Sequence, residues 1–597
     1  MAELISREEQ KTENTWDLER MYKSDAAWEE ELKSLRPEKD KMAAYQGRLG
    51  EGPELLTEAL ETVSSISRRL ENLFVYASQR SDENTADAHY QDMSMRVYSF
   101  LVDFSAAISF LEPEMLALGA ETLNTWLKDY EPLQKFSRRI ELILRRAEHT
   151  LPPEQEVLLA RAAELTAAPG EAYNLLSDAD LDFGYVEHKG EKVEINQSNF
   201  VMLQQNPDRE LRRKVYEQFY SVWRGHENTI ASLYQSNIKA SLFMSRARHY
   251  SSNRAMYLFD SAVPESLYDN LLETVHDYLP EMHRYVKLRK KMLGLDEMHF
   301  YDVYVPLVQD MDKRYSFDEA KSIVLEALKP LGEEYTKVVE SAFENRWMDI
   351  YPNKGKRSGA YSSGSYDSYP YMLLNFNGRL DDIFTLIHEM GHSMHSYFTK
   401  THQPYETGSY KIFVAEVAST CNEALLLHYL LDKTTDKTMR KVLINQYLEG
   451  FKSTLFRQTM FAEFEKIAHA KAEAGESLTA PVLNGIYKEL NAAYFGDDMV
   501  VDDTIALEWA RIPHFYRPFY VYQYATGYSA AVALSRRILE EGEPAVKNYL
   551  KFLSSGSSQD PIDLLKLAGV DMTKKETVAS ALDVFSSLID EMEQLQA

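Results

Sequence analysis

A stretch with three histidines interrupts an apolar segment at residues 384–398, which reads FTLIHEMGHSMHSYF. Burying polar side chains without partners costs a few kcal/mol each, so these residues must satisfy one another or hold an ion. His388 and His392 are four residues apart, which places both on one face of a helix. Two imidazoles at this spacing can bind one zinc ion. Glu389 can take a proton from a water that the zinc makes acidic, so the pattern predicts zinc-dependent hydrolysis.

A third metal ligand is expected, because catalytic zinc usually has three protein ligands and a water. The metzincin pattern is excluded, since it requires Gly at position 395 and His at position 398, where this sequence has His395 and Phe398. Among downstream carboxylates, Glu406 lies in a predicted turn, where a solvated glutamate needs no partner. Glu416 lies in a second apolar helical segment, where a glutamate does need one. We therefore expect Glu416 to be the third ligand.

Three further residues of these two helical segments are expected to support the site. Glu423 is the alternative third ligand, but we expect it to orient a ligand histidine. His395 shares the ligand face one turn beyond His392, and we expect it to line the site as a hydrogen-bonded histidine. Cys421 is expected to be a small buried side chain and no ligand.

Helices are the elements that must position these residues. The 597 residues include only 24 glycines and 20 prolines. Apolar residues recur at steps of three and four, the helical period, in five long segments: 56–79, 86–112, 208–248, 264–294 and 436–473. The helix with the histidines follows an Asn377-Gly378 turn, and Asp381 or Asp382 can cap it. The fold class is therefore predicted to be mainly α.

Two short segments predict β structure. FGYVEHKGEKVEINQ, residues 183–197, has β-prone runs on both sides of a Lys-Gly turn, which is typical of a hairpin. YMLLNF, residues 371–376, predicts one strand after a loop rich in glycine, serine and tyrosine. From these patterns we predict three regions: 1–115 and 116–200, both helical, the second ending in the hairpin, and a large catalytic region, 201–597.

Composition restricts the partners and the compartment. A formal net charge of −27 argues against nucleic acid and against anionic membranes, which both need a cationic protein face. No segment approaches the roughly 18 apolar residues of a membrane span, and the charged first twenty residues do not resemble a secretory signal peptide. A single cysteine excludes an internal disulfide. We therefore expect a cytoplasmic protein.

Aromatic residues cluster near the C-terminus in RIPHFYRPFYVYQYATGYSAA, residues 511–531. Ordinary packing is one interpretation. Buried tyrosine hydroxyls need hydrogen-bond partners, however, and His514 precedes them in a proline-flanked loop. Peptide hydrolysis requires donors directed at the developing oxyanion, and tyrosine and histidine are suitable donors. Both interpretations stay open at this point.

The three segments around residues 355–398, 413–426 and 514–527, together with NTWDLERMYKSDAAWEEE near the start, resemble oligoendopeptidase F of the thimet oligopeptidase (M3) family of zinc peptidases. The resemblance implies an elongated, zincin-type, mainly α fold with a small β element beside the active-site helix. It also implies a deep channel that admits short peptides and excludes folded proteins. It implies one zinc ion per chain, bound by His388, His392 and Glu416, with Glu389 as general base.

The same resemblance implies roles for further residues. His514, Tyr520, Tyr524 and Tyr528 lie where the family has residues that bind substrate and stabilise the transition state. The spacings from His514 to Tyr520 and from Tyr524 to Tyr528 are each one residue longer than in thimet-type relatives, so either Tyr524 or Tyr528 donates to the oxyanion. Residues 355–377, with Gly359 and Asn375, flank the peptide, and YMLLNF pairs with it as an edge strand.

Three functions compete. The first is a cytoplasmic zinc endopeptidase that cleaves internal bonds of short unstructured peptides. The second is a zinc carboxypeptidase, which needs a cation for the substrate's terminal carboxylate; Arg357 or Arg517 could serve. The third is a non-catalytic binding protein with a structural metal, but such a site has no use for the base Glu389.

Overall fold

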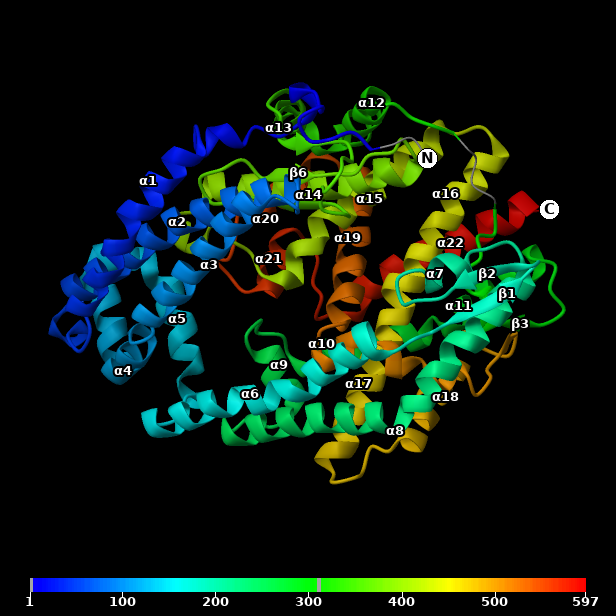
Figure 1. The fold of residues 1–597 in the computed structure, drawn as a ribbon, viewed down its shortest axis with the longest axis horizontal. Coiled ribbons are helices and arrows are strands. Elements are labelled where there is room, and N and C mark those ends of the chain that lie inside the picture. Colours follow the sequence, from blue (N-terminus) through cyan, green and yellow to red (C-terminus); the bar gives the residue numbers. More distant parts are fainter. Residues whose placement is uncertain (1–3, 309–312, 597) are drawn as a thin grey trace. The chain divides into compact units, whose positions relative to one another are not determined.

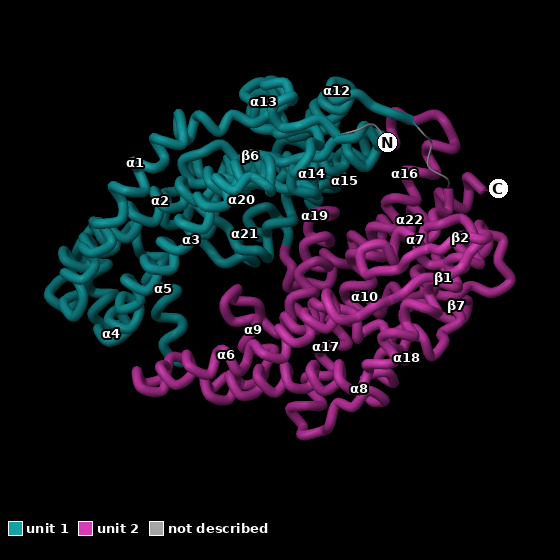
Figure 2. The backbone as a smooth tube through the Cα atoms, in the orientation of Figure 1, with its two compact units in different colours: residues 1–148, 312–430, 534–570 teal, residues 149–311, 431–533, 571–597 magenta. Residues whose placement is uncertain are grey.

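The computed structural model describes residues 4–308 and 313–596. The predicted mainly helical fold is confirmed, with only short strands among the helices (Figure 1). The chain divides into two compact units, each assembled from three separate segments (Figure 2). Unit 1 comprises residues 1–148, 312–430 and 534–570, and unit 2 comprises residues 149–311, 431–533 and 571–597.

Unit 1 holds the histidine-rich helix, α14 (Leu380–His402), and most of the next helix, α15 (Ile412–Lys433). Its other helices are α1 (Asp25–Leu35), α2 (Pro53–Glu83), α3 (Ala88–Ala107), α4 (Leu111–Asp129), α5 (Ser137–Arg145), α12 (Phe317–Ala327), α13 (Gly332–Glu344), α20 (Glu543–Leu553) and α21 (Pro561–Leu567). The segments 56–79 and 86–112 are thus helical as predicted, in α2 and α3.

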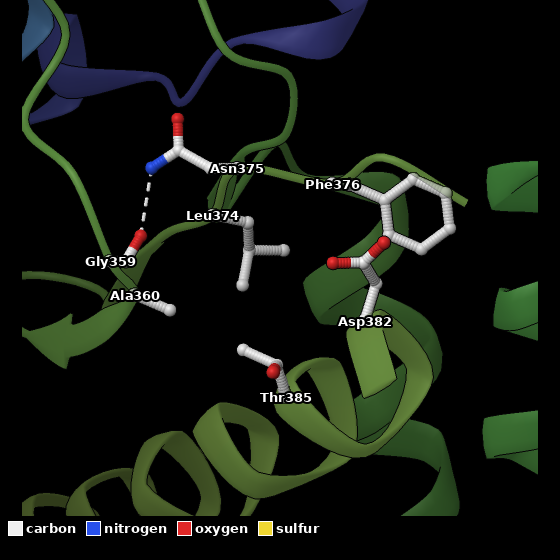
Figure 3. Close-up of a pocket in the computed structure, with 7 residues that line it drawn as sticks. All are labelled: Gly359, Ala360, Leu374, Asn375, Phe376, Asp382 and Thr385. Atoms are coloured by element: carbon white, nitrogen blue, oxygen red, sulfur yellow. Dashed lines mark hydrogen bonds between the residues drawn. The ribbon is translucent and has the colours of Figure 1, made fainter. Parts of the chain in front are cut away.

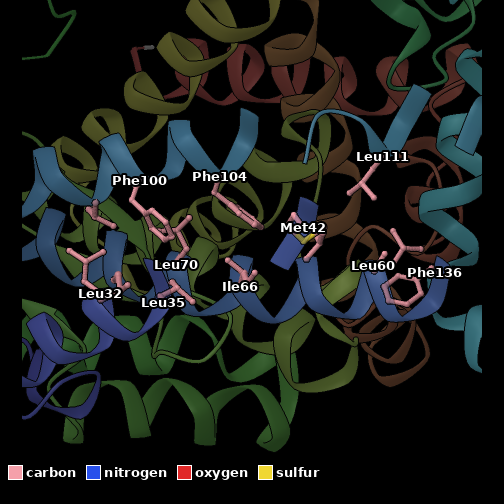
Figure 4. Close-up of a cluster of buried hydrophobic side chains, with 14 of the residues drawn as sticks. Leu32, Leu35, Met42, Leu60, Ile66, Leu70, Phe100, Phe104, Leu111 and Phe136 are labelled. Carbon is pink, nitrogen blue, oxygen red and sulfur yellow. The ribbon is translucent and has the colours of Figure 1, made fainter. Parts of the chain in front are cut away.

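A hydrophobic core joins the N-terminal helices of unit 1 to the strand before α14. Helix α2 buries Leu56, Leu60, Val63 and further residues at three- and four-residue steps, so one apolar stripe faces inward (Figure 4). The same cluster of buried side chains includes Tyr371, whose hydroxyl donates to the Asp17 carbonyl at 2.6 Å. The beginning of the chain therefore supports the element that leads into the histidine-rich helix.

A three-stranded sheet of order β4-β6-β5 lies beside α14 in unit 1. Its strands are β4 (Met348–Asp349), β5 (Tyr361–Ser363) and β6 (Tyr371–Leu373). Strand β6 pairs with β4 in parallel and with β5 in antiparallel. The predicted strand at YMLLNF exists, but the expectation that it is an edge strand is wrong, because both of its sides are already paired. The edge strands of this sheet are β4 and β5, and β5 is the one that contacts α14.

Helices α14 and α20 pack together within unit 1. The Thr399 hydroxyl donates to the Leu553 carbonyl at 2.9 Å, and the Gln403 amide donates to the Ser554 carbonyl at 2.9 Å. The C-terminal half of α14 therefore depends on residues more than 150 positions further along the chain.

Unit 2 carries the aromatic segment 511–531 and the predicted hairpin. Strands β1 (Tyr185–His188) and β2 (Glu191–Glu194) pair around Lys189 and Gly190, both with positive φ, as a two-residue hairpin turn requires. The other strands, β3 (Met298–His299) and β7 (Met499–Val500), pair in parallel. The helices are α6 (Pro153–Leu175), α7 (Phe200–Gln204), α8 (Arg209–Ala247), α9 (Asn253–Phe259), α10 (Glu265–Asp277), α11 (Leu279–Met292), α16 (Lys437–Gly450), α17 (Arg457–Glu473), α18 (Ala480–Phe495), most of α19 (Tyr522–Glu541) and α22 (Lys575–Gln596).

Several expectations about organisation stay predictions. These are the region boundaries near residues 115 and 200, the elongated shape and the substrate channel. Across the described residues, every helix is either too short or too polar to cross a lipid bilayer.

Candidate metal centre and active site

The metal-ligand motif occupies the middle of α14. The Asp382 carboxylate accepts hydrogen bonds from the backbone N–H groups of Asn377 (3.0 Å) and of the N-cap residue Arg379 (2.8 Å), so Asp382 caps the helix from its third position, as in a capping box. One face of α14 is apolar and buried, with Ile383, Leu386, Ile387, Met390 and Met394 among its residues. This burial fixes the rotation of the helix, and His388 and His392 therefore face the same way, with ring centroids 4.9 Å apart.

Glu416 of α15 completes a group of three possible metal ligands with His388 and His392. The Glu416 Oε2 atom lies 3.4 Å from Nε2 of each histidine. Metal bonds of about 2.0–2.1 Å at a tetrahedral angle place two ligand atoms about 3.4 Å apart, so the donor set fits zinc. Burial opposes ionisation of Glu416, but hydrogen bonds from both imidazoles hold the pKa of its carboxyl well below the usual range. This is the one such group among the residues with a described placement.

Gly391 sets the distance between the two helices that carry the ligands. A Cβ atom at Gly391 would lie 2.5 Å from the Ser419 Cα and 2.8 Å from the Ala418 carbonyl oxygen of α15. Real Cβ atoms do not come so close to backbone, so only glycine permits this approach. This role of Gly391 was not predicted, although a glycine in the middle of an amphipathic helix is a signal of close packing.

Two side chains of α15 contact the candidate ligands. The Glu423 carboxylate accepts a hydrogen bond from Nδ1 of His388, which leaves Nε2 directed at Glu416. The Ser419 hydroxyl donates to the carbonyl oxygen of Glu416 at 3.0 Å and to its Oε2 at 3.1 Å. Glu423 thus has the position expected of an orienting residue, whereas Ser419 was not singled out from the sequence.

Glu389 is buried beside the ligands, with 7% of its surface exposed. Burial raises the pKa of its carboxyl above the usual value, and the backbone N–H of Ser362 in β5 hydrogen-bonds to it. The Ser362 hydroxyl also lies 2.8 Å from the Ser393 hydroxyl of α14, so the strand is fixed against the helix. A buried carboxylate beside a candidate metal site and held by a backbone donor is suited to proton transfer.

Three other residues singled out from the sequence near the metal motif are buried or partly buried. His395 is 1% exposed and stacks on Tyr410 with ring centroids 3.7 Å apart; burial lowers its pKa to about 3, so the ring is neutral. Its Nδ1 atom has no hydrogen-bond partner among the described residues, and the ring also contacts Phe552, with centroids 5.2 Å apart. Cys421 is buried and free, as expected. Glu406 is partly buried and accepts a hydrogen bond from Ser64, so the expectation of a solvated glutamate is wrong.

The aromatic residues singled out near the C-terminus gather in unit 2. His514 lies in a 3₁₀ turn, Pro513–Tyr516, with ring centroids 6.4 Å from Tyr520 and 6.0 Å from Tyr524. Tyr528 follows one helical turn after Tyr524 on α19 and packs edge-on against Phe451 at 5.1 Å. Burial and the nearby Arg517 guanidinium lower the pKa of His514 below its ordinary value, so its imidazole is neutral near pH 7.

The loop that carries Tyr520 is held by a buried carboxyl group. Phe519 has a φ of +54°, a conformation that costs energy for a residue with a side chain. Its backbone N–H donates at 3.0 Å to Glu465 of α17, which is fully buried. This hydrogen bond stabilises the strained residue directly before Tyr520, and nothing in the sequence pattern around Glu465 indicated it.

The residues expected to bind substrate lie in both units. In unit 1, the Asn375 amide donates to the carbonyl oxygens of Gly359 (2.8 Å) and Arg357 (3.0 Å). The Arg357 guanidinium itself contacts the Asp82 carboxylate at 3.3 Å. In unit 2, Arg517 lies over the Tyr520 ring at 4.3 Å. Both arginines considered for a carboxypeptidase therefore already have partners.

Two family models match this chain. The model of peptidase family M3 matches residues 202–584, and the model of oligopeptidase F matches residues 114–183. The chain belongs to peptidase family M3. It is accordingly a metalloendopeptidase, a hydrolase that acts on peptides and requires a metal cofactor.

Individual proteins support this membership over nearly the whole chain. Oligopeptidase PepF of Bacillus subtilis is 44% identical, covering 99% of this chain and 89% of that protein. Group B oligopeptidase PepB of Streptococcus agalactiae is 42% identical, covering 98% of this chain and 97% of that protein. Among solved structures, a peptidase from Chlamydophila abortus has a TM-score of 0.93 at 34% identity, covering 99% and 100%. Oligoendopeptidase F from Enterococcus faecium has a TM-score of 0.75 at 36% identity, covering 96% and 99%.

Proposed function

We propose that this M3 peptidase is a zinc-dependent oligoendopeptidase that hydrolyses internal bonds of short, unstructured peptides. The observation that carries the proposal is the group His388, His392 and Glu416, at separations that fit zinc, with the buried Glu389 beside it. The substrate class rests on the names of the relatives, which are oligopeptidases and an oligoendopeptidase F.

In this mechanism His388, His392 and Glu416 would hold one zinc ion, and the hydrogen bond from Nδ1 of His388 to Glu423 keeps Nε2 of that ring unprotonated. A bound zinc supplies a Lewis acid, which makes a water molecule acidic near neutral pH. Glu389 takes the proton from the attacking water and then delivers it to the leaving amine. The Ser362 N–H holds the Glu389 carboxylate in place during both transfers.

From the family pattern we further propose roles for two sets of residues. One is the aromatic cluster of His514, Tyr520, Tyr524 and Tyr528, and the other is the loop and strand of residues 355–377. His514 and either Tyr524 or Tyr528 donate hydrogen bonds to the oxyanion, and Tyr520 binds substrate. Gly359 and Asn375 border the peptide in unit 1. The compartment is proposed to be the cytoplasm, because one cysteine in 597 residues suits a reducing environment. The charge of −27 disfavours nucleic acid and anionic membranes as partners.

The decisive experiment is mass spectrometry of the products from a ladder of unstructured peptides and one folded protein. Zinc-loaded wild type and Glu389→Gln are compared, with metal content measured for both. We expect internal cuts in the short peptides, no cut in the folded protein, and a loss of about 10²–10⁴-fold or more in the variant with its zinc retained. Release of single C-terminal residues would instead identify a carboxypeptidase. Cleavage by the variant at the wild-type rate would refute the role of Glu389.

A further inference from the structure

A pocket of about 210 Å³ opens beside the first turns of α14, entirely within unit 1 (Figure 3). Residues 359–360, before β5, and residues 374–376, after β6, line one side. Asp382 and Thr385 of α14 line the other. An apolar cavity of about 150 Å³ holds a benzene molecule, so this one is large enough for an aromatic side chain.

The pocket lies directly next to the residues that perform the chemistry. Thr385 precedes His388 by three residues and Glu389 by four, so it shares their face of α14, about 4.5–6 Å along the helix axis. On the strand side, Ala360 is two residues from Ser362, whose N–H contacts Glu389. A side chain one or two residues from the scissile bond therefore reaches the pocket.

The walls combine an apolar floor with one charge. Leu374 and Phe376 are 3% and 6% exposed, and in Figure 3 the side chains of Leu374, Ala360 and Thr385 extend toward the same central space. The Asp382 carboxylate, fixed by two backbone N–H groups, stands at the side next to Phe376. The pocket thus offers apolar contact to a side chain and one negative charge near its edge.

The Asn375 side chain points away from this space and bonds to the Gly359 carbonyl (Figure 3). It connects the two segments that form the strand-side wall. Gly359 has a φ of +82°, and a Cβ there would meet no atom within 4 Å, so the wall at this residue is open. Asn375 therefore shapes the pocket, and Gly359 leaves its entrance clear.

We propose that this pocket is a specificity subsite for a substrate side chain close to the scissile bond, and that Asp382 is its selectivity residue. It takes aliphatic and aromatic side chains on Leu374 and Phe376, and lysine or arginine with the charged end at Asp382. It rejects aspartate and glutamate, because their charge repels that of Asp382 in a partly buried site. This inference rests on the proposed endopeptidase function.

The orientation of the peptide follows from β5, an edge strand of the sheet whose Ser362 contacts Glu389. Antiparallel strand pairs outnumber parallel ones about two- to three-fold, so we place the peptide antiparallel to β5. From the N-terminus to the C-terminus of the peptide, its residues then lie opposite residues of β5 with decreasing numbers. Since the pocket lies at residue 360, before Ser362, the side chain that enters it belongs to the C-terminal side of the cut.

The test measures kcat/KM for peptides that differ in one residue, leucine, alanine, lysine or glutamate, placed on either side of a fixed cleavage site. For Asp382→Asn we expect the leucine-to-glutamate ratio to fall about tenfold, at the C-terminal side only. Asp381→Asn is the matched control, since it removes the same charge one residue earlier, from a side chain outside the pocket lining. Its ratio should stay at the wild-type value.

A second variant keeps the test decisive if Asp382→Asn folds poorly for lack of its cap. Thr385→Leu narrows the pocket, so the ratio of leucine to alanine peptides should fall about tenfold. If both variants keep wild-type ratios while wild type cuts internal bonds, the subsite proposal is refuted and the endopeptidase stands. A change confined to the N-terminal side refutes the proposed orientation. If wild type makes no internal cut, the endopeptidase and the subsite fall together.

Discussion

The metal centre of unit 1 and the aromatic cluster of unit 2 obtain their geometry in different ways. The metal ligands lie on two packed helices, where a spacing of four residues and one glycine contact determine the distances. The aromatic cluster depends on an irregular loop, in which Phe519 has a strained conformation held by Glu465. On helices, the spacing in the sequence determines which side chains lie together. In a loop, the positions of the side chains depend on contacts with remote segments.

The largest effect is expected when one ligand of the metal centre is removed and the aromatic cluster is left intact. His388→Ala leaves two ligands, so the zinc should dissociate and activity should fall by more than about 10⁴-fold. Metal content by inductively coupled plasma mass spectrometry, with peptidase activity in parallel, checks this. Tyr524→Phe is the contrasting variant and should retain the metal in full. Complete zinc retention by His388→Ala would contradict the assigned ligand set.

The next effect probes the aromatic cluster. Removing one oxyanion donor costs about 10²–10³-fold in kcat with little change in KM. We expect this loss for either Tyr524→Phe or Tyr528→Phe, measured by steady-state kinetics on one peptide. Tyr528 packs on Phe451, and its hydroxyl would lie 3.0 Å from a Cβ at Gly450. An unchanged kcat in both variants would remove the tyrosines from the mechanism.

A smaller effect is expected where the metal centre is supported but not formed. Glu423→Gln weakens the hydrogen bond that orients His388, and such changes cost about 10–100-fold in metal affinity or activity. Competition with a zinc chelator, followed by activity, measures the affinity. Glu406→Gln is a suitable control, since Glu406 bonds to Ser64 and is not part of the metal group. Equal zinc affinity of the two variants would contradict the orienting role.

The smallest effect comes from a residue that touches no ligand. Gly391→Ala forces α14 and α15 apart, and overpacking of this kind costs about 1–3 kcal/mol of stability. We expect a lower thermal midpoint and weaker zinc binding, both measurable by calorimetry with and without added zinc. Ala418→Gly in the same chain should not restore the midpoint, because the atoms of α15 that would be crowded belong to the backbone. An unchanged midpoint in Gly391→Ala would show that the helices adjust freely.

The sequence predicted the helices and the metal group because both follow short-range periodicity. His388, His392 and Glu416 required only two helical segments and the rule that buried carboxylates need partners. The edge-strand expectation for YMLLNF failed because the second neighbour of β6, Met348–Asp349, lies more than twenty residues earlier and has no strong strand pattern. Ser362, Glu465 and the pocket beside Thr385 escaped prediction for the same reason, since each depends on segments that meet only in the folded chain.

The contact between α14 and α20 bears on how the enzyme is made. The hydrogen bond from Thr399 to Leu553 means that the helix with Glu389 lacks part of its packing until residue 553 has been synthesised. Domains fold as units during translation, and translation adds about 5–20 residues per second. The ribosome therefore releases almost the whole chain before unit 1 can close around its active site. A chain that ends before residue 553 lacks this part of the packing of α14.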